Sequence, residues 1–311
     1  MKKLFVILGV FAVVCAAIGF QNPRFIDGGN LTNLSLRVAF LTLFALGEAL
    51  VIIAGGIDLS IGSMICFSAI TFGGLITWKE WPFAAAAGAA IGVSLLTGLV
   101  QGLLVTKVRV PAFIVTLGGL LILRSLCRFV TDDNSVSLGS RYPWFRSLSE
   151  APSGGGVPPL VWIVLGITAV MAVVVHKLRF GRYCFAIGGN VEAARLAGIP
   201  TDRIRIATYM ISAGLAGLAG ILYTSYLPSV QPSSVGNASE LYAVAAAVLG
   251  GCSLVGGVGL IPGVVVGVAL MYVLQNGITL LEISDKLEMT VVGTVILLAS
   301  VADAMFQRKR A

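Results

Sequence analysis

The sequence predicts an all-α, polytopic membrane protein with about ten transmembrane helices, and three observations carry this prediction. Of its 311 residues, 57% are hydrophobic and 11% are charged, whereas soluble domains carry roughly 25% charged residues. Apolar runs of about 20 residues recur along the chain, each long enough to cross roughly 30 Å of hydrocarbon. Glycine is frequent, with 38 residues, and glycine lets membrane helices pack closely.

The apolar runs place ten predicted spans in one domain that covers residues 1–311. The first run follows two lysines and lacks a clean small-residue cleavage site, so we expect an uncleaved span and not a signal peptide. The run 239–252 is short, which leaves open a half-helix or re-entrant segment, although an even number of spans favours a crossing. The predicted spans are 4–20, 36–54, 60–77, 83–106, 111–130, 160–177, 205–226, 239–252, 259–279 and 288–306.

Basic residues set the orientation of these spans. With the N-terminus inside, thirteen of the 21 Lys and Arg residues fall in cytoplasmic positions and five in external ones, as the positive-inside rule requires. All four tryptophans fall at the external interface, where an aromatic belt is expected. We therefore predict a multi-pass protein of the cell (inner) membrane, in contact with the lipid bilayer, with both termini cytoplasmic. The net charge of +7 is explained by the span ends and indicates no nucleic-acid partner.

The cytoplasmic loop 180–205 is the most basic segment and contains one short predicted helix. We expect the Gly188-Gly189 pair to interrupt the chain and Asn190 to be the N-cap of this helix. Glu192 lies in the first turn, where the helix dipole favours negative charge, and Gly198 ends the helix. About two turns of helix do not fold alone, so this helix needs a partner, which we expect to be a second protein.

Two further patterns concern packing and the outer surface. The longest external loop, 131–158, is rich in Asp, Ser, Pro and Gly, and is either a flexible surface loop or a landing surface for an external partner. Small-residue faces predict close helix contacts. They comprise the pairs Gly88 and Gly92, Gly98 and Gly102, and Gly263 and Gly267, and the triplet Gly214, Gly217 and Gly220.

The stretch 54–63, AGGIDLSIGS, allows two interpretations. In the first, a glycine pair ends one span and Asp58 and Ser60 are candidate N-caps for the next, in a tight cytoplasmic turn. In the second, a helix is broken and its backbone and the Asp58 carboxylate line a gate, because irregular backbone at membrane depth is tolerated only beside a cavity. A string with similar glycine spacing at 250–257 suggests a two-fold internal repeat.

Ionisable residues inside membrane spans are functional candidates. Glu48 lies in the middle of a span, and we expect it to be hydrogen-bonded within the bundle. Arg124 lies about two turns below the external end of its span and is long enough to reach the interface. Polar side chains within spans, such as Thr116, either contact a passing solute or bond a neighbouring helix. The candidates for the translocation path or gate are Glu48, Gly55, Gly56, Asp58, Ser60, Thr116 and Arg124.

Several catalytic arrangements are missing from the sequence. No G-x-x-x-x-G-K-[ST] phosphate loop is present, so the chain does not hydrolyse ATP by that route. The single histidine, His176, lies at a span end among cationic residues and is expected to be an interfacial anchor. The five cysteines are scattered and show no metal-site or disulfide spacing. We therefore expect no catalytic residue, no metal site and no cofactor in this chain, which we do not predict to be an enzyme.

Several of these stretches resemble the permease subunits of bacterial ribose/xylose/arabinose-type sugar ABC importers, and the ribose-type permease most closely. The resemblance is carried by GGIDLSIGS at 55–63, VPAFIVTLGGLLILRSL at 110–126 and the block 180–306, including FGRYCFAIGGNVEAARLAGI and LGGCSLVGGVG. It implies an all-α permease fold of about ten spans, a second permease chain that is identical or related, cytoplasmic ATPase subunits that bind ATP, and an external solute-binding protein.

In such permeases the cytoplasmic loop docks into a groove of the ATPase subunit. Carried over by motif, the resemblance places this contact at Gly189, Asn190, Glu192, Ala193, Ala194, Arg195, Leu196 and Gly198.

The function that this resemblance implies is import of a monosaccharide such as ribose, with ATPase motion coupled to alternating access. One alternative is another small solute, such as autoinducer-2, galactofuranose or a sugar alcohol. Another is an ion-coupled secondary transporter that uses Glu48 and Asp58 as proton or cation sites. The chain departs from the family at Tyr242, where Glu-Leu-Asp is usual, and Glu48 is also unusual for its position, so both bear on which sugar is carried.

Overall fold

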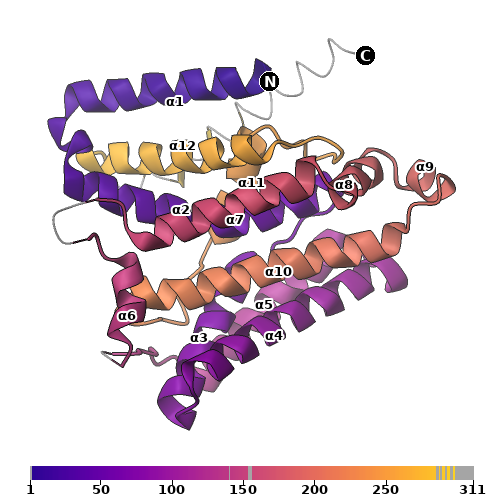
Figure 1. Cartoon of the computed structure of the whole chain (residues 1–311), viewed down its shortest axis with the longest axis horizontal. Coiled ribbons are helices and arrows are strands. Elements are labelled where there is room, and N and C mark those ends of the chain that lie inside the picture. Colours follow the sequence, from indigo (N-terminus) through magenta and orange to yellow (C-terminus); the bar gives the residue numbers. More distant parts are fainter. Residues whose placement is uncertain are drawn as a thin grey trace.

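The structure is a computed structural model that describes residues 2–139, 141–152 and 156–284, and beyond them only residues 287, 289, 290, 293, 294 and 297. The described chain is almost entirely helical and forms an elongated bundle (Figure 1). Its extended structure is limited to one isolated antiparallel bridge between Val136 and Val230. Eight helices are long and apolar enough to cross a membrane. The all-α, polytopic fold class is therefore confirmed.

The first half of the chain contains α1 (Lys2–Gln21), α2 (Gly28–Ile53), α3 (Ile61–Lys79), α4 (Phe83–Leu103), which continues into a π-helical turn (Leu104–Val108), and α5 (Ala112–Thr131). The second half contains the short α6 (Pro143–Arg146), then α7 (Pro159–His176), α8 (Arg179–Gly189), α9 (Val191–Leu196), α10 (Thr201–Tyr226), α11 (Ser239–Leu249) and α12 (Ile261–Leu280). Two single 3-10 turns cover Pro23–Ile26 and Ser147–Ser149.

Nine predicted spans correspond to helices of the structure, which are α1 to α5, α7 and α10 to α12. The predicted bounds agree well because each span is a long apolar run with polar or glycine-rich ends. The tenth predicted span, 288–306, lies almost wholly outside the described residues.

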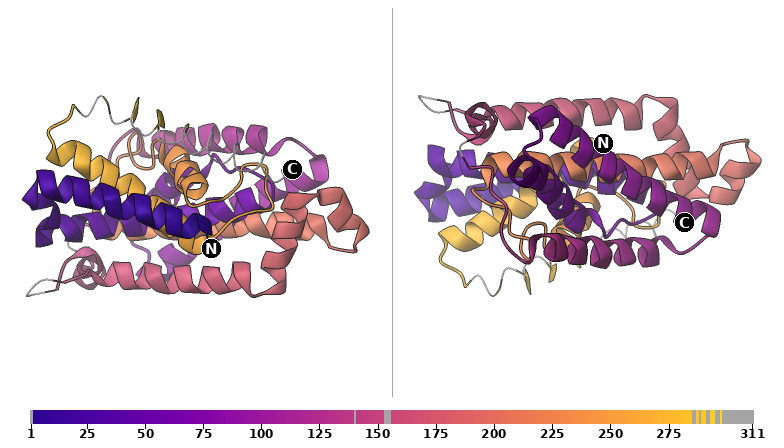
Figure 2. Two further views of the ribbon diagram at one scale, coloured as in Figure 1. Left: turned by 90° about the horizontal axis from the view of Figure 1, so that it is seen from above. Right: turned by 90° about the horizontal axis from the view of Figure 1, so that it is seen from below.

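Helices α2 and α10 form the centre of the bundle. α10 packs against α2, α3 and α4, and 89% of the most apolar part of α2 is buried. α1 lies at the outer edge beside α12 (Figure 1), and α5 and α7 lie on opposite sides of the central helices (Figure 2). Because α2 and α10 contact most of the other helices, displacement of either would displace the helices packed against it.

Close helix contacts occur at most of the predicted small-residue faces. A Cβ on Gly98 or Gly102 would lie within 2.8 Å of α10 backbone atoms, and one on Gly267 would meet the carbonyl of Ala246. The glycine triplet of α10 faces α3 and α4 in the same way. The prediction is wrong for Gly88 and Gly92, since a Cβ at either position would meet nothing within 4 Å. Their face of α4 is directed away from the described helices.

Two non-helical segments interrupt the bundle. The segment 54–60 joins α2 to α3, and the segment 227–238 leads from α10 to α11. α11 has 11 residues, which gives a length of roughly 16 Å, about half of a hydrocarbon core. The segment before it is mostly a run of hydrogen-bonded turns, which starts beside the bridge with Val136 and has Gly236 against Gly62. The predicted span 239–252 is thus a short helix, Ser239–Leu249, preceded by turns.

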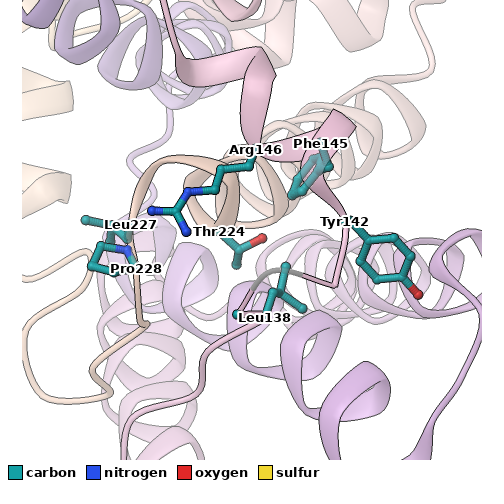
Figure 3. A pocket seen from close by; sticks show the side chains of 8 residues that line it. Leu138, Tyr142, Phe145, Arg146, Thr224, Leu227 and Pro228 are labelled. Atoms are coloured by element: carbon teal, nitrogen blue, oxygen red, sulfur yellow. The ribbon is translucent and has the colours of Figure 1, made fainter.

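The loop 131–158, predicted to be external, is mostly exposed where the structure describes it, but it buries Val136, Phe145 and Ser149 against the bundle. α6 lies across one end of the bundle, which we call the α6 end; the opposite end, where α9 projects, is the α9 end (Figure 1). The aromatic ring of Phe83, at the start of α4, contacts the rings of Tyr142 and Phe145 in this loop. Arg146 extends from α6 toward the chain after α10, beside a small cavity of about 10 Å³ (Figure 3).

Candidate coupling site and buried polar network

Helix α9 forms the tip of the α9 end and projects beyond the bundle (Figure 1). Asn190 is its N-cap, since its side-chain oxygen accepts a hydrogen bond from the amide of Ala193 at 2.9 Å, as predicted. Glu192 lies in the first turn and forms an ion pair with Arg195 at 2.9 Å. The cap and the ion pair stabilise a helix that is too short to fold on propensity alone.

The C-terminal end of α9 also agrees with the prediction. Gly198 has a φ of +80°, which a residue with a Cβ adopts only with strain. Its amide bonds the carbonyl of Arg195, and the next amide, of Ile199, bonds the carbonyl of Ala194 at 3.1 Å. These bonds satisfy carbonyls that the helix leaves without partners.

The surface of α9 is largely unoccupied by the rest of the chain. Ala194 is its only buried residue, whereas the side chain of Leu196 is 89% exposed at the tip. Leu196 is therefore accessible from outside the bundle.

One prediction for this loop holds only in part. The helical chain does break at Gly189, where α8 ends, but α8 runs through Gly188. A Cβ on Gly188 would collide with the backbone of Ile53 and with the amide of Gly257. The glycine at this position serves close contact between α8 and two other segments, and not a chain break.

We call this contact the glycine junction and define it by Gly55, Gly188, Gly189, Gly256 and Gly257. The amide of Gly257 donates a hydrogen bond to the carbonyl of Ile53 at 2.9 Å. A Cβ on Gly256 would lie 2.9 Å from the Cα of Gly55 and 3.1 Å from that of Gly188. The similar glycine strings at 55–62 and 250–257 thus meet in space, and both touch the end of α8.

The segment 54–60 is held by a buried polar network centred on Asp58, which is 0% exposed. One carboxylate oxygen of Asp58 accepts hydrogen bonds from the amide and the hydroxyl of Ser60, at 3.0 and 2.6 Å. The other accepts one from the hydroxyl of Ser212 in α10, at 3.0 Å. The amide of Asp58 lies 3.3 Å from both carboxylate oxygens of Glu48 in α2. Glu48 is hydrogen-bonded within the bundle, as expected.

Two further helices contact the same segment. The Gln101 side chain of α4 donates a hydrogen bond to the Ser60 hydroxyl at 2.8 Å. The Thr116 hydroxyl of α5 lies 3.2 Å from the carbonyl of Ile57 and 3.0 Å from that of Ala112 in its own helix, and either carbonyl can accept its proton. Side chains of α2, α4, α5 and α10 therefore fix this one segment, and the described chain gives Glu48 and Asp58 no ion pair with a basic residue.

Neither interpretation of 54–63 holds in full. The helix is broken as in the second interpretation, but Asp58 is enclosed by hydrogen bonds and does not face an open gate. Ser60 does occupy the N-cap position of α3, but its side chain makes no capping bond, and the prediction of Asp58 as an N-cap is wrong. Ser212 was missed by sequence reasoning because it lies 154 positions away from Asp58.

The segment 227–238 has a different anchor, Arg124 of α5. Its guanidinium donates hydrogen bonds to the carbonyls of Pro232 and Val235, at 3.0 and 2.6 Å. Arg124 thus bonds two backbone carbonyls of the segment 227–238. The carboxylate of Glu240 lies against Gly62, and its Oε2 atom is buried without a hydrogen bond. Arg124 also lines an open hollow of about 490 Å³ on α5.

The structure divides the seven path candidates into three groups. Glu48, Gly56, Asp58, Ser60 and Thr116 are buried together around the segment 54–60. Gly55 belongs to the glycine junction. Arg124 lies apart, on the second non-helical segment.

Comparison with known proteins agrees with this architecture. The family described as branched-chain amino acid transport system / permease component matches residues 30–300. A ribose import permease protein of Bacillus subtilis (strain 168) is 39% identical over 304 residues, which cover 97% of this chain and 93% of that protein. An L-arabinose transport system permease protein of Escherichia coli (strain K12) is 34% identical over 304 residues, covering 97% and 91%. No solved structure matches the chain.

The family match over residues 30–300, together with the eight apolar helices of the described chain, identifies a polytopic membrane permease. The chain belongs to the family of branched-chain amino acid transport system permease components. The similar proteins are transport permeases and not enzymes.

Proposed function

We propose that this chain is the membrane-spanning permease subunit of an ATP-driven importer of ribose or a related simple sugar, with α9 as the contact for the ATPase subunit. The observation that supports the proposal most is α9 itself. It is a capped helix, and its exposed Leu196 follows Gly189 of the glycine junction by seven residues. The contact would involve Gly189, Asn190, Glu192, Ala193, Ala194, Arg195, Leu196 and Gly198. ATP would be bound by the partner and not by this chain.

The glycine junction suggests how motion of the ATPase subunit reaches the membrane. A push on α9 moves the end of α8, where Gly188 is in backbone contact with Gly256 and Gly55. Gly55 leads directly into the segment that Asp58 fixes to α10, and Gly256 lies between α11 and α12. Interfaces packed this closely move as units and do not deform gradually. ATPase motion would therefore shift the segment 54–60 and the connection between α11 and α12 together.

The orientation follows from the basic residues. α9 and its flanking arginines would face the cytoplasm, and the α6 end would face outward, where an external solute-binding protein delivers the sugar. Both termini would be cytoplasmic, in the cell (inner) membrane. A second permease chain, identical or related, would complete the transporter, as the resemblance implies.

The sugar class rests on the relatives, whose names specify ribose and L-arabinose. Tyr242 and Glu48 depart from the family pattern, so a related small solute stays the alternative substrate. An ion-coupled mechanism is less well supported. Its candidate sites, Glu48 and Asp58, are fully buried and already hydrogen-bonded to the segment that they hold.

The test is uptake of labelled ribose into proteoliposomes that contain the chain together with its ATPase subunit and binding protein. We expect uptake that requires ATP and all three components, and that persists when ion gradients are collapsed. Unlabelled arabinose and a sugar alcohol, added as competitors, rank the substrates. Uptake by this chain alone, abolished by an uncoupler, would contradict the proposal and favour the ion-coupled mechanism.

A further inference from the structure

His176, the only histidine of the chain, lies where three helices meet. It is the last residue of α7, and its ring stacks on Phe185 of α8, with ring centroids 6.0 Å apart and planes at 29°. Its Nε2 atom accepts a hydrogen bond from the amide of Ile261, the first residue of α12, at 3.1 Å. One imidazole therefore connects α7 and α8 to the start of α12.

This hydrogen bond requires one protonation state. A ring nitrogen that accepts a hydrogen bond carries no proton, so the imidazole is neutral and its proton is on Nδ1. The Ile261 amide belongs to the first turn of a helix, where amides have no acceptor within the helix. His176 supplies that acceptor. Protonation of Nε2 would place two donors face to face and add a positive charge at the positive end of the α12 dipole.

The surroundings of His176 do not compensate such a charge. Lys177 follows it directly, and α8 contributes Arg179 and Arg182. α12 carries no charged residue, and α2 carries only Arg37 and Glu48, of which Glu48 is bonded to Asp58. The described part of the chain contains no ion pair between His176 and a carboxylate.

The position of the bond matters because of what lies beside it. Ile261 follows Gly257 of the glycine junction by four residues. Just after it, Gly263 packs against the carbonyl of Gly250, at the end of α11. The hydrogen bond thus holds the start of α12 against α7 and α8. It does so just after the connection between α11 and α12, whose Gly257 touches the end of α8.

We propose that His176 is a pH-sensitive positioning residue: when neutral it fastens the start of α12 to α7 and α8, and when protonated it releases it. Histidine titrates near pH 6.5 in model peptides, and both the hydrogen bond to the neutral ring and the nearby cations oppose its protonation, so release requires acidification below that value. The contact itself is independent of the function proposed above. Its effect on transport rests on that function.

The first experiment examines the contact directly. The full chain, carrying a purification tag without histidine, is labelled with ¹⁵N-histidine and reconstituted in lipid nanodiscs, so that its one imidazole gives the only ring signals. At pH 8 we expect the tautomer with a proton on Nδ1 and none on Nε2. A dominant Nε2–H tautomer, or rapid averaging between both as in a free imidazole, would overturn the proposal.

The second experiment measures ATP-dependent uptake by the assembled transporter between pH 8 and pH 5.5. His176→Gln keeps an acceptor oxygen but does not titrate, whereas His176→Phe keeps the ring without an acceptor. Losing one hydrogen bond weakens the link by about fivefold. We expect uptake by the wild type to fall by about that factor relative to His176→Gln on acidification, and uptake by His176→Phe to be low throughout.

The outcomes separate the two proposals. An acid decline of equal size in the wild type and His176→Gln would overturn the role of His176 in transport. If ATP drives no uptake at any pH, the function proposed above fails, while the tautomer still decides whether His176 caps α12. Thermal unfolding of each variant at pH 8 identifies any substitution that only prevents folding.

Discussion

The two non-helical segments inside the bundle, 54–60 and 227–238, are held in opposite ways. Four helices fix the first through buried side chains, with Asp58 accepting three hydrogen bonds. The second is fixed mainly through its own backbone, by two bonds from Arg124, by the paired backbone bonds between Val136 and Val230, and by contact between Gly236 and Gly62. The first is thus tied to the surrounding helices by side chains, and the second by bonds to its own carbonyls and amides.

The most sensitive position is the contact of the second segment with the start of α3, directly after the first segment. A Cβ introduced by Gly62→Ala would collide with the carbonyl of Gly236 and the carboxylate of Glu240, so the segment 227–238 and the start of α3 must separate. We expect a loss of about 3 kcal/mol in the free energy of unfolding, measured by denaturant titration in micelles. The matched control is Gly88→Ala in α4, where a Cβ meets open space. Equal stability of the two variants would show that Gly62 and Gly236 are not in contact.

The next effect concerns the first segment. Asp58→Ala leaves the hydroxyls of Ser60 and Ser212 without their acceptor and deprives the loop of its link to α10. Because buried donors are then unsatisfied, we expect a loss of about 2 kcal/mol. Ser212→Ala removes only one of these bonds and should cost about half as much. An Asp58→Ala variant no less stable than Ser212→Ala would contradict the central place of Asp58 in the network.

Removal of Arg124 tests the second segment alone. Arg124→Gln loses the bonds to the carbonyls of Pro232 and Val235 and should cost about 1.5 kcal/mol. Hydrogen exchange by mass spectrometry should show faster exchange at 227–238 and unchanged exchange at 54–60. Faster exchange in both segments would mean that they are held as one unit, and would contradict separate anchoring of 54–60 and 227–238.

The smallest effect is expected one turn further along the same helix. Arg128 pairs with Asp133 at 2.8 Å, and both side chains are exposed. Its hydrogen bond lowers the pKa of Asp133 below the ordinary value, so the pair stabilises the fold above about pH 4 and is lost as pH falls through the lowered pKa. Arg128→Gln should lower the unfolding midpoint slightly at pH 7 and not at pH 2. A loss as large as that of Arg124→Gln would contradict this ranking.

The sequence predicted the helices well and their contacts unevenly. Spans follow from apolar runs, and the cap at Asn190 follows from local residue types, so both are local properties. The fourfold attachment of 54–60 depends on Ser212, which no local pattern connects with Asp58. The segment 227–238 before α11 carries no periodic pattern that reveals its position in the bundle. Gly88 and Gly98 have the same small-residue spacing, yet only Gly98 faces another helix, because spacing does not specify direction.

The loop 180–205 shows the same difference between local and distant contacts. Gly198 was predicted to end α9 because a residue at positive φ after a helix is a local requirement. Gly188 was predicted to break the chain, since glycine in a helix is locally unfavourable. In the structure α8 continues through it, because the position must admit the backbone of Ile53 and Gly257. A glycine retained for a distant contact looks the same in the sequence as one retained for a turn.

The central claim is that α9 is the contact for an ATPase subunit, and site-specific photo-cross-linking measures this directly. A photoreactive amino acid replaces Leu196 at the exposed tip of α9, and in a matched control it replaces the exposed Trp144 of α6 at the opposite end. In membranes that contain the whole transporter, the account predicts a cross-link to the ATPase subunit from position 196 and none from position 144. No ATPase cross-link from position 196, in a complex that still hydrolyses ATP and transports, would contradict the account.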